Sequence, residues 1–529
     1  MKRATRAIEM SYPAAGGWIS SNAIAIYKIV YAAYNRFPSP SLNQTMRPRR
    51  LCALLVAAGV AGCAAPATEP APPLVVPAAY RATPATAAAA WPGADWWRGF
   101  GSAELDGLIA AAQQDNFDLA AALARVRQAD AQLALAGAPL LPSVSAAGKE
   151  SWSRQTTTKR VSSTSFATTT GVTEARSYSL SPTVSYELDF WGRVRAGRDA
   201  AAASALASRF DQQTVALTVV TSVAATWFQA LALQDRLDVA NRNLADAEQI
   251  LAAIRARESV GTASQLDIAQ EETLVAGLRA QVPALRNQLT QQVNALGVLV
   301  GKPPSEITVR PGTLTALKLP ETAPGVPSAL LGRRPDVASA EALLRVQNAN
   351  IRAARAAMFP QIALTGSAGW SNIALPLLFG PGSLFANAAL SATQTIFDNG
   401  AKRAQVAYDQ ARADELLADY RKTVVQAFTD VDNAISAYRL TTEQEGLERQ
   451  AVATAQRAAD IARAQVLAGT IDIVTALQAQ TTLFNDLDLL AQVRLARFQA
   501  LLSLYKALGG GWSQADIAAP DTALFQGVL

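Results

Sequence analysis

The sequence predicts a mixed, mainly helical fold built from one unit written twice, with one β-hairpin in each copy. Gly261-Thr262 and Gly469-Thr470 match at a separation of 208 residues, and the same offset brings other pairs into register. These pairs are Gly192 with Gly400, Leu296 with Leu504 and Gly301 with Gly509. Upstream the offset is 218, which places a ten-residue insertion in the first copy between Pro142 and Gly192. Glycines and prolines at element ends carry these matches, so we interpret them as an internal duplication.

Composition excludes several classes of function. The 529 residues are 50% hydrophobic, with a modest net charge of +5 and no basic run of the kind that tracks phosphate backbones, so nucleic acid is not an expected partner. Histidine is absent, which removes the commonest general base, nucleophile activator and zinc ligand. We therefore expect no enzyme, no cofactor and no metal site.

The N-terminal region carries an export signal. Residues 46–62 combine a basic start, a short apolar stretch and small residues before Cys63, as a secretory signal peptide does. Small residues directly before a cysteine look like a bacterial lipoprotein box, which implies cleavage there and acylation of Cys63. Ala64 in place of an aspartate implies sorting to the outer membrane. We interpret residues 1–45 as a spurious upstream extension, the alternative being a genuine leader.

The remaining chain divides into five segments. Alanine and proline dominate the first of them, which we expect to be an extended tether behind the acylated cysteine. Two repeats then flank a linker, and a short tail ends the chain. The expected segments are the tether at 63–101, repeats at 102–302 and 333–511, the linker at 303–332 and the tail at 512–529.

Each repeat contains one segment with strand periodicity. Tyr178–Leu188 alternates apolar and polar residues, which is typical of a strand with two different faces. We expect a first hairpin over about 142–190, with the Ser/Thr-rich residues 153–170 as its loop. The same alternation predicts a second hairpin over about 360–397. The chain therefore supplies four strands.

Long helices surround these hairpins. A first helix is expected from Ser102 to Pro139. Arg193–Glu258 contains no proline and carries heptad-spaced apolar residues, so it predicts one helix about 100 Å long. Its uncharged part, Thr214–Leu233, is long enough to span a bilayer. The duplicated segment Lys422–Thr441 carries four charges, so we prefer a soluble coiled-coil helix. Each repeat then turns back as a helical hairpin.

The strand count predicts an assembly. Two-faced strands fit a β-sandwich as well as a membrane barrel, but an exported chain with long coiled-coil helices favours the barrel. Four strands cannot close a barrel, and lipid does not tolerate open sheet edges. Two chains give eight strands and a filled interior, whereas three give twelve and a water-filled lumen. We therefore predict a trimeric 12-stranded outer-membrane β-barrel continued by a periplasmic α-helical coiled-coil barrel.

Six motifs then carry a family resemblance over roughly residues 46–512. They are Trp96–Phe100, Asn116–Leu119, Leu140–Ser143, Tyr186–Arg193, Arg333–Val337 and Ile396–Gly400. In this order and spacing they resemble TolC-like outer-membrane efflux lipoproteins of the NodT-like kind. The resemblance implies the outer-membrane channel of a tripartite pump, passively exporting small molecules such as drugs or solvents. It also implies a periplasmic adaptor and an inner-membrane transporter of the RND type as partners.

The resemblance also points to functional residues at the two helical hairpin tips. It implies adaptor docking at Val260, Gly261, Thr262, Leu266, Asp267, Gly469, Thr470 and Val474. The family often closes its periplasmic aperture with carboxylates, but the matching positions here are Thr475 and Gln478. Asp472 is the acidic residue close by that could substitute for them.

Two further carboxylates and two alternative functions complete the expectations. Glu187 and Asp189 alternate onto the polar face of their strand, where a trimer would place them around the lumen and favour cations.

The outer-membrane duct of a type I protein-secretion system remains an alternative function. So does a non-conducting lipoprotein that tethers envelope layers.

Overall fold

The computed structural model describes residues 80–81, 91–160, 168–320, 327–512 and 517. Contacts divide the chain into Met1–Pro73, which holds no described residue, and Leu74–Leu529. All described residues therefore belong to the second unit. The expected signal peptide, Cys63 and nearly all of the C-terminal tail lie outside the described residues.

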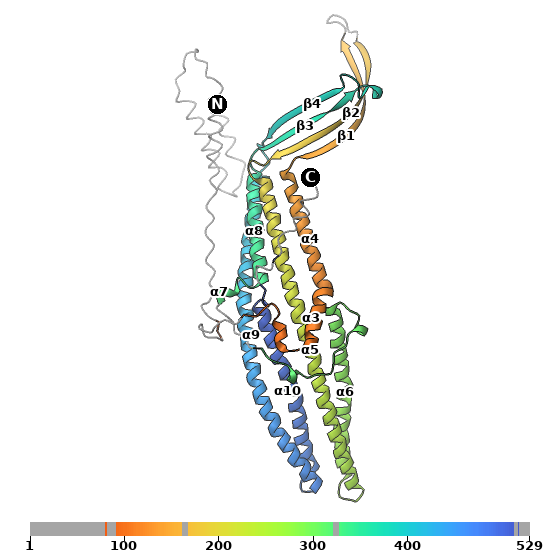
Figure 1. The fold of residues 1–529 in the computed structure, drawn as a ribbon, viewed down its shortest axis with the longest axis vertical. Coiled ribbons are helices and arrows are strands. Elements are labelled where there is room, and N and C mark those ends of the chain that lie inside the picture. The colour runs from red at the N-terminus through yellow and green to blue at the C-terminus, as the bar shows by residue number, and fades with distance from the viewer. Residues whose placement is uncertain (1–79, 82–90, 161–167, 321–326, 513–516, 518–529) are drawn as a thin grey trace, which may run out of the picture. The chain divides into compact units, whose positions relative to one another are not determined.

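The described part of this unit contains seven longer helices and four strands, with short helices between them (Figure 1). The helices are α3 (Ala103–Asp115), α4 (Phe117–Gly137), α5 (Arg193–Glu258), α6 (Gln265–Val300), α8 (Pro335–Ala356), α9 (Ala401–Ala468) and α10 (Ile473–Ala507). The strands are β1 (Ser143–Arg160), β2 (Thr168–Leu188), β3 (Gln361–Asn372) and β4 (Leu384–Thr393). The short helices are η1 (Trp96–Phe100), η2 (Ala138–Leu140), η3 (Pro304–Glu306), η4 (Leu314–Ala316), α7 (Pro327–Leu330) and η5 (Leu375–Leu377).

The two longest helices confirm the sequence prediction. α5 is one helix of 66 residues and α9 one of 68, because neither contains a proline to remove a backbone donor. The helix expected from Ser102 to Pro139 was wrong, since it breaks at Asn116. The Asn116 side chain accepts from the Leu119 amide at 2.9 Å, starting α4, and donates to the Leu299 carbonyl at 2.8 Å. A capping side chain therefore outcompetes helix continuation at this position.

Equivalent glycine contacts confirm the duplication. Gly301 and Gly509 follow α6 and α10 with positive φ values of 75° and 89°. A Cβ on Gly301 would lie 2.2 Å from the Asp115 carbonyl oxygen, and one on Gly509 would lie 2.0 Å from that of Arg333. Asp115 and Arg333 are separated by the upstream offset of 218 residues. Both copies thus use a glycine for the same close backbone approach.

The four strands form one antiparallel sheet in the order β1-β2-β3-β4. One hairpin per repeat was correctly predicted, but the loop expected at 153–170 is largely strand. β1 and β2 pair from Ser143↔Ser185 out to Arg160↔Thr168, whereas β2 pairs with β3 only over Tyr178–Leu188. Ser/Thr-rich sequence suggested a loop, yet β-branched threonines also suit a two-stranded ribbon. The additional residues of the first copy lengthen this ribbon.

The largest hydrophobic core lies where α3, α5, α6 and α10 meet the short helix η1. Trp96 stacks on Tyr505 with 4.6 Å between ring centroids, and Phe100 meets Phe228 edge-on at 4.9 Å. Both η1 residues are buried, so the described end of segment 63–101 belongs to the folded unit. The tether expectation was therefore wrong for residues 96–101, because large aromatic side chains stabilise a core when they are buried.

Among the described residues, α5 is the one helix long and apolar enough to cross a membrane, and 56% of its most apolar window is buried within the protein. Val223, Trp227 and Phe228, which lie in its uncharged part, are core residues of the same cluster. The helix contacts α4, α6, α8 and α10 along its length. These contacts support our preference for a packed coiled-coil helix.

A charged network joins α9 to α10. Glu445 is 2% exposed and accepts from Arg449 at 2.5 Å, from Arg494 at 3.1 Å and from Arg497 at 2.9 Å. Burial alone would raise the pKa of Glu445, but the three guanidinium hydrogen bonds outweigh it and lower that pKa below its usual value. A carboxylate therefore stays ionised inside the helix pair.

Candidate transport surface and helix tips

The sheet has two chemically different faces. Directly paired residues share a face, so one row across the four strands contains Val144, Val184, Gly366 and Ala388. The adjacent row, which points the other way, contains Ser145, Thr183, Ser367 and Asn387. One face is therefore apolar and the other polar, as the alternation predicted.

The apolar face is uncovered in the single chain. Val144, Leu384 and Leu390 are 71%, 69% and 68% exposed, although large aliphatic side chains are usually buried. An exposed apolar patch of this extent indicates contact with lipid or with another protein. β1 and β4 each pair on one side only among the described residues, so the sheet also has two open edges.

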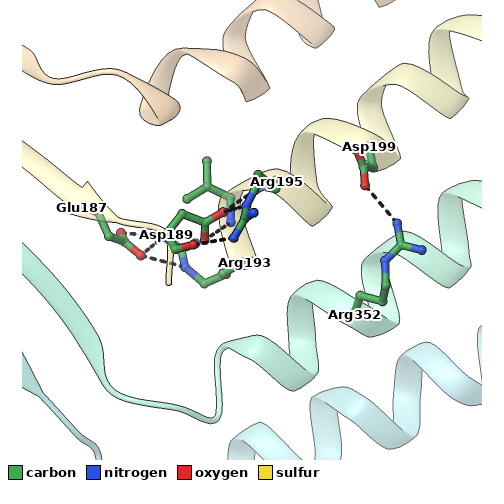
Figure 2. Close-up of polar contacts among 7 residues, drawn as sticks. Glu187, Asp189, Arg193, Arg195, Asp199 and Arg352 are labelled. Carbon is green, nitrogen blue, oxygen red and sulfur yellow. Dashed lines mark hydrogen bonds and ion pairs between the residues drawn. The ribbon is translucent and has the colours of Figure 1, made fainter. Parts of the chain in front are cut away.

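Charged side chains lock the junction between β2 and α5 (Figure 2). Glu187 accepts from Arg193, with 2.7 and 2.8 Å between the guanidinium nitrogen and the two carboxylate oxygens. Asp189 accepts from the backbone amides of Val194 at 3.0 Å and Arg195 at 2.8 Å. A carboxylate at this position satisfies free amides and complements the helix dipole. Farther along α5, Asp199 pairs with Arg352 of α8 at 3.1 Å.

These contacts correct the expectation for Glu187 and Asp189. β2 ends at Leu188, so Asp189 is not on the strand, and its side chain caps α5 instead. Glu187 is on the polar face but is neutralised by Arg193. The strand placement of Asp189 is therefore wrong, because a strand-end acid followed by arginines caps the next helix. The lumen position of Glu187 stays a prediction, and its charge is paired.

The two tips have the same backbone geometry. Gly261 and Gly469 both have φ of 75°, a left-handed conformation that favours glycine. The Thr262 hydroxyl donates to the Arg257 carbonyl at 2.9 Å, and the Thr470 hydroxyl donates to the Gln465 carbonyl at 3.1 Å. Each threonine thus satisfies a carbonyl at the end of the preceding long helix. The Gly-Thr pair is explained by this turn alone.

Apolar residues are exposed beside each turn. Val260 and Leu266 are 72% and 65% exposed at the first tip, and Val474 is 43% exposed at the second. Asp267 has a structural partner, since it forms a capping box with Ser264 at the start of α6. The expected docking residues therefore include apolar side chains that the chain itself leaves uncovered.

The expected gate candidates lie together at the N-cap and in the first two turns of α10. Asp472 accepts from the Thr475 amide at 2.8 Å and from its hydroxyl at 3.0 Å, so it is the N-cap of this helix. These two hydrogen bonds from Thr475 lower the pKa of Asp472. Thr475 and Gln478 are exposed. Asp472 thus remains ionised and has a local structural role.

A contact that sequence reasoning missed joins the two tips. Arg257, near the end of α5, donates to the Val466 carbonyl of α9 at 2.5 Å. Ile254, Ala462, Val466 and Ile473 pack into one small core at the same level. The Glu445 network was also missed, and the one sequence signal for it was Arg494 interrupting an apolar heptad seam.

Comparisons with known proteins agree with this geometry. The model of the outer membrane efflux protein family matches residues 108–302 and 326–510. The chain is 38% identical over 469 residues to the pyoverdine export outer membrane protein OpmQ of Pseudomonas putida, covering 89% of this chain and 98% of that protein. It is 33% identical over 449 residues to the antibiotic efflux pump outer membrane protein ArpC of Pseudomonas putida, covering 82% and 92%.

Solved structures show the same architecture. A crystal structure of a membrane protein from Pseudomonas aeruginosa matches with a TM-score of 0.72 and 32% identity, covering 84% of this chain and 100% of that chain. Crystal structures of CusC, which describe conformational changes accompanying folding and transmembrane channel formation, match with a TM-score of 0.71 and 27% identity, covering 84% of this chain and 100% of that chain.

Proposed function

Because this chain belongs to the outer membrane efflux protein family, we propose that three copies close one twelve-stranded barrel and continue as one helical tube into the periplasm. The protein is an outer-membrane channel of a tripartite efflux system. The proposal concerns how this chain builds the conduit. Each chain supplies four strands and the two helical hairpins α5/α6 and α9/α10.

The open, two-faced sheet carries this proposal. Its apolar face suits lipid and its polar face suits a water-filled lumen. The free edges of β1 and β4 must pair within the bilayer, because an unpaired backbone amide or carbonyl in lipid costs several kcal/mol. β1 of one copy pairing with β4 of the next satisfies both edges at once.

Cysteine crosslinking tests the closure. Single cysteines along the outer edge of β1, combined with single cysteines along β4, are expected to give disulfide-linked trimers in membranes. Ser179→Cys with Ser371→Cys is the matched control, because these residues pair within one chain and should crosslink without changing its mass. Failure of every β1–β4 combination, alongside a positive control, contradicts the closure.

The tips are proposed as the docking surface for a periplasmic adaptor. Exposed Val260, Leu266 and Val474 support this, since apolar side chains at a helix end away from the sheet need a protein partner. Gly261→Asp or Gly469→Asp should abolish adaptor crosslinking while trimers persist. Gly107→Asp is the control, because nothing lies within 4 Å of a Cβ at that position. Unchanged adaptor crosslinking in both tip variants contradicts the assignment.

The transported class is proposed to be small organic molecules. Relatives named for pyoverdine export, antibiotic efflux and toluene efflux support this. An RND-type transporter is proposed as the inner-membrane partner, and acylation of Cys63 as an additional anchor. Purified trimers in planar bilayers should conduct, whereas a tethering lipoprotein would not.

A further inference from the structure

One buried carboxyl group has no role in the proposed conduit. Glu271 of α6 is 0% exposed, and neither of its carboxylate oxygens accepts a hydrogen bond. Buried polar groups in folded proteins are nearly always hydrogen-bonded, so this is an exception that requires a reason. Ionising a carboxyl group that is buried away from water and has no hydrogen-bond or charged partner costs much free energy.

Glu271 occupies a core position of a coiled coil. Ile268, Glu271, Val275, Leu278 and Val282 follow the three-four spacing of heptad core residues. Val275 and Leu278 belong to a cluster that joins all four long helices, and Ile268 packs against that same cluster. A glutamate therefore stands where the pattern around it places aliphatic side chains.

The same four-helix bundle holds a second buried polar group without a partner. On α10, Gln480 is 7% exposed, and its side-chain nitrogen has no acceptor. A cavity of about 270 Å³, lined on α6 by Thr273 and Leu274 among others, extends between α5, α6 and α10. Water thus has a short route to Glu271 once these helices separate.

No charge compensates an ionised Glu271 among the described residues. Burial alone raises its pKa from 4.5 to about 7, without a contribution from any neighbouring charge. On α10, Ile473–Asn485 contains no charged residue. On α5, α6 and α9 the charged groups at this level are engaged at the surface. They are Arg255 with Glu272, Arg279 with Glu248, Arg463 with Asp246, Asp460 with Gln456, Arg457 with Thr454, and Asp267 with Ser264.

We propose that Glu271 is a proton-dependent latch that holds the tip half of the four-helix bundle closed while its carboxyl is protonated. When the helices around it part and water enters, the carboxyl ionises and reclosure must take up a proton. Both states are protonated below about pH 4.5, so the latch is then strongest. The free energy needed to open this part of the bundle falls as the pH rises from 4.5 to about 7, and it stays constant above 7.

Hydrogen exchange of the full-length trimer in detergent tests the latch. After correction for intrinsic exchange rates, the opening constant for amides of α6 between residues 265 and 285 should rise on the order of 100-fold from about pH 5 to about pH 8. Glu271→Gln should remove this rise. Glu271→Leu should do the same and keeps the test available if the glutamine variant does not assemble.

Glu272→Gln is the matched control, because Glu272 is an exposed neighbour paired with Arg255 and its removal should leave the pH dependence intact. Wild-type exchange that does not change with pH, or changes equally in Glu271→Gln, overturns the latch. The proposal rests on the conduit, and the two failures differ. Trimers that do not conduct at any pH contradict the proposed conduit. Hydrogen exchange that lacks the expected pH dependence, in trimers that do conduct, contradicts only the latch.

Discussion

The buried carboxylate Glu445 offers the sharpest test of how the helical part is held together. Its side chain is 3% exposed and pairs with three arginines, of which Arg494 and Arg497 are 15% and 19% exposed. Glu445→Gln keeps the size of the side chain but removes its charge. Two largely buried guanidinium groups then face each other without an anion between them.

The expected loss of unfolding free energy in Glu445→Gln follows from the burial of its arginine partners. Removing one partner of a buried ion pair costs about 3–5 kcal/mol, because the remaining charge is desolvated without compensation. Arg449 is 59% exposed, and exposed pairs contribute about 0–1 kcal/mol, so Arg449→Gln is the matched control. We expect Glu445→Gln to lower the free energy of unfolding by about 3 kcal/mol and the control by less than about 1 kcal/mol.

Denaturant unfolding of detergent-solubilised protein, followed by far-UV circular dichroism, measures both values. The pKa of Glu445 is lowered from 4.5 by its arginines, so its contribution is complete above about pH 4.5 and is lost as the pH falls through the lowered value. Equal losses in Glu445→Gln and Arg449→Gln would refute the reasoning. So would a Glu445→Gln defect that persists undiminished in strong acid.

Three further predictions concern a glycine contact, an ion pair and the acylated cysteine. Gly301→Ala should lower the thermal midpoint of unfolding markedly, since its Cβ would lie 2.2 Å from the Asp115 carbonyl oxygen. Gly107→Ala is the control and should stabilise its helix by about 0.5–1 kcal/mol. Equal midpoints in the two variants contradict this prediction. Joint substitution of Glu187→Gln and Arg193→Gln should leave the reversal potential of reconstituted channels unchanged, because the two opposite charges of this pair cancel, and a shift contradicts that cancellation. Cys63→Ser should abolish palmitate incorporation, and retained label contradicts acylation at that residue.

Periodicity and duplication made much of the fold predictable. Heptad spacing and the absence of proline gave α5 within its observed bounds, and the repeated glycines located both tips. Two predictions of secondary structure were wrong because local side chains favoured a different backbone conformation from the one the composition suggested. Asn116 stops a helix that its alanine-rich neighbours favour, and threonines taken for a loop extend the ribbon formed by β1 and β2.

The site was less predictable, because long-range partners decide what a charged residue does. Asp189 and Asp472 are helix caps rather than free carboxylates. Glu445 and Glu271 are both buried, yet one has three arginine partners and the other has none recorded among the described residues. The local sequence distinguishes them only by Arg449, which follows Glu445 by four residues where Val275 follows Glu271. The rest of the difference arises only when four helices from distant parts of the chain pack together.

Native mass measurement of the purified, detergent-solubilised protein tests the central claim most directly. Four strands with two open edges require partners in lipid, so the account predicts a stable particle of three chains. A particle of one chain that remains folded and inserted in a bilayer would contradict it.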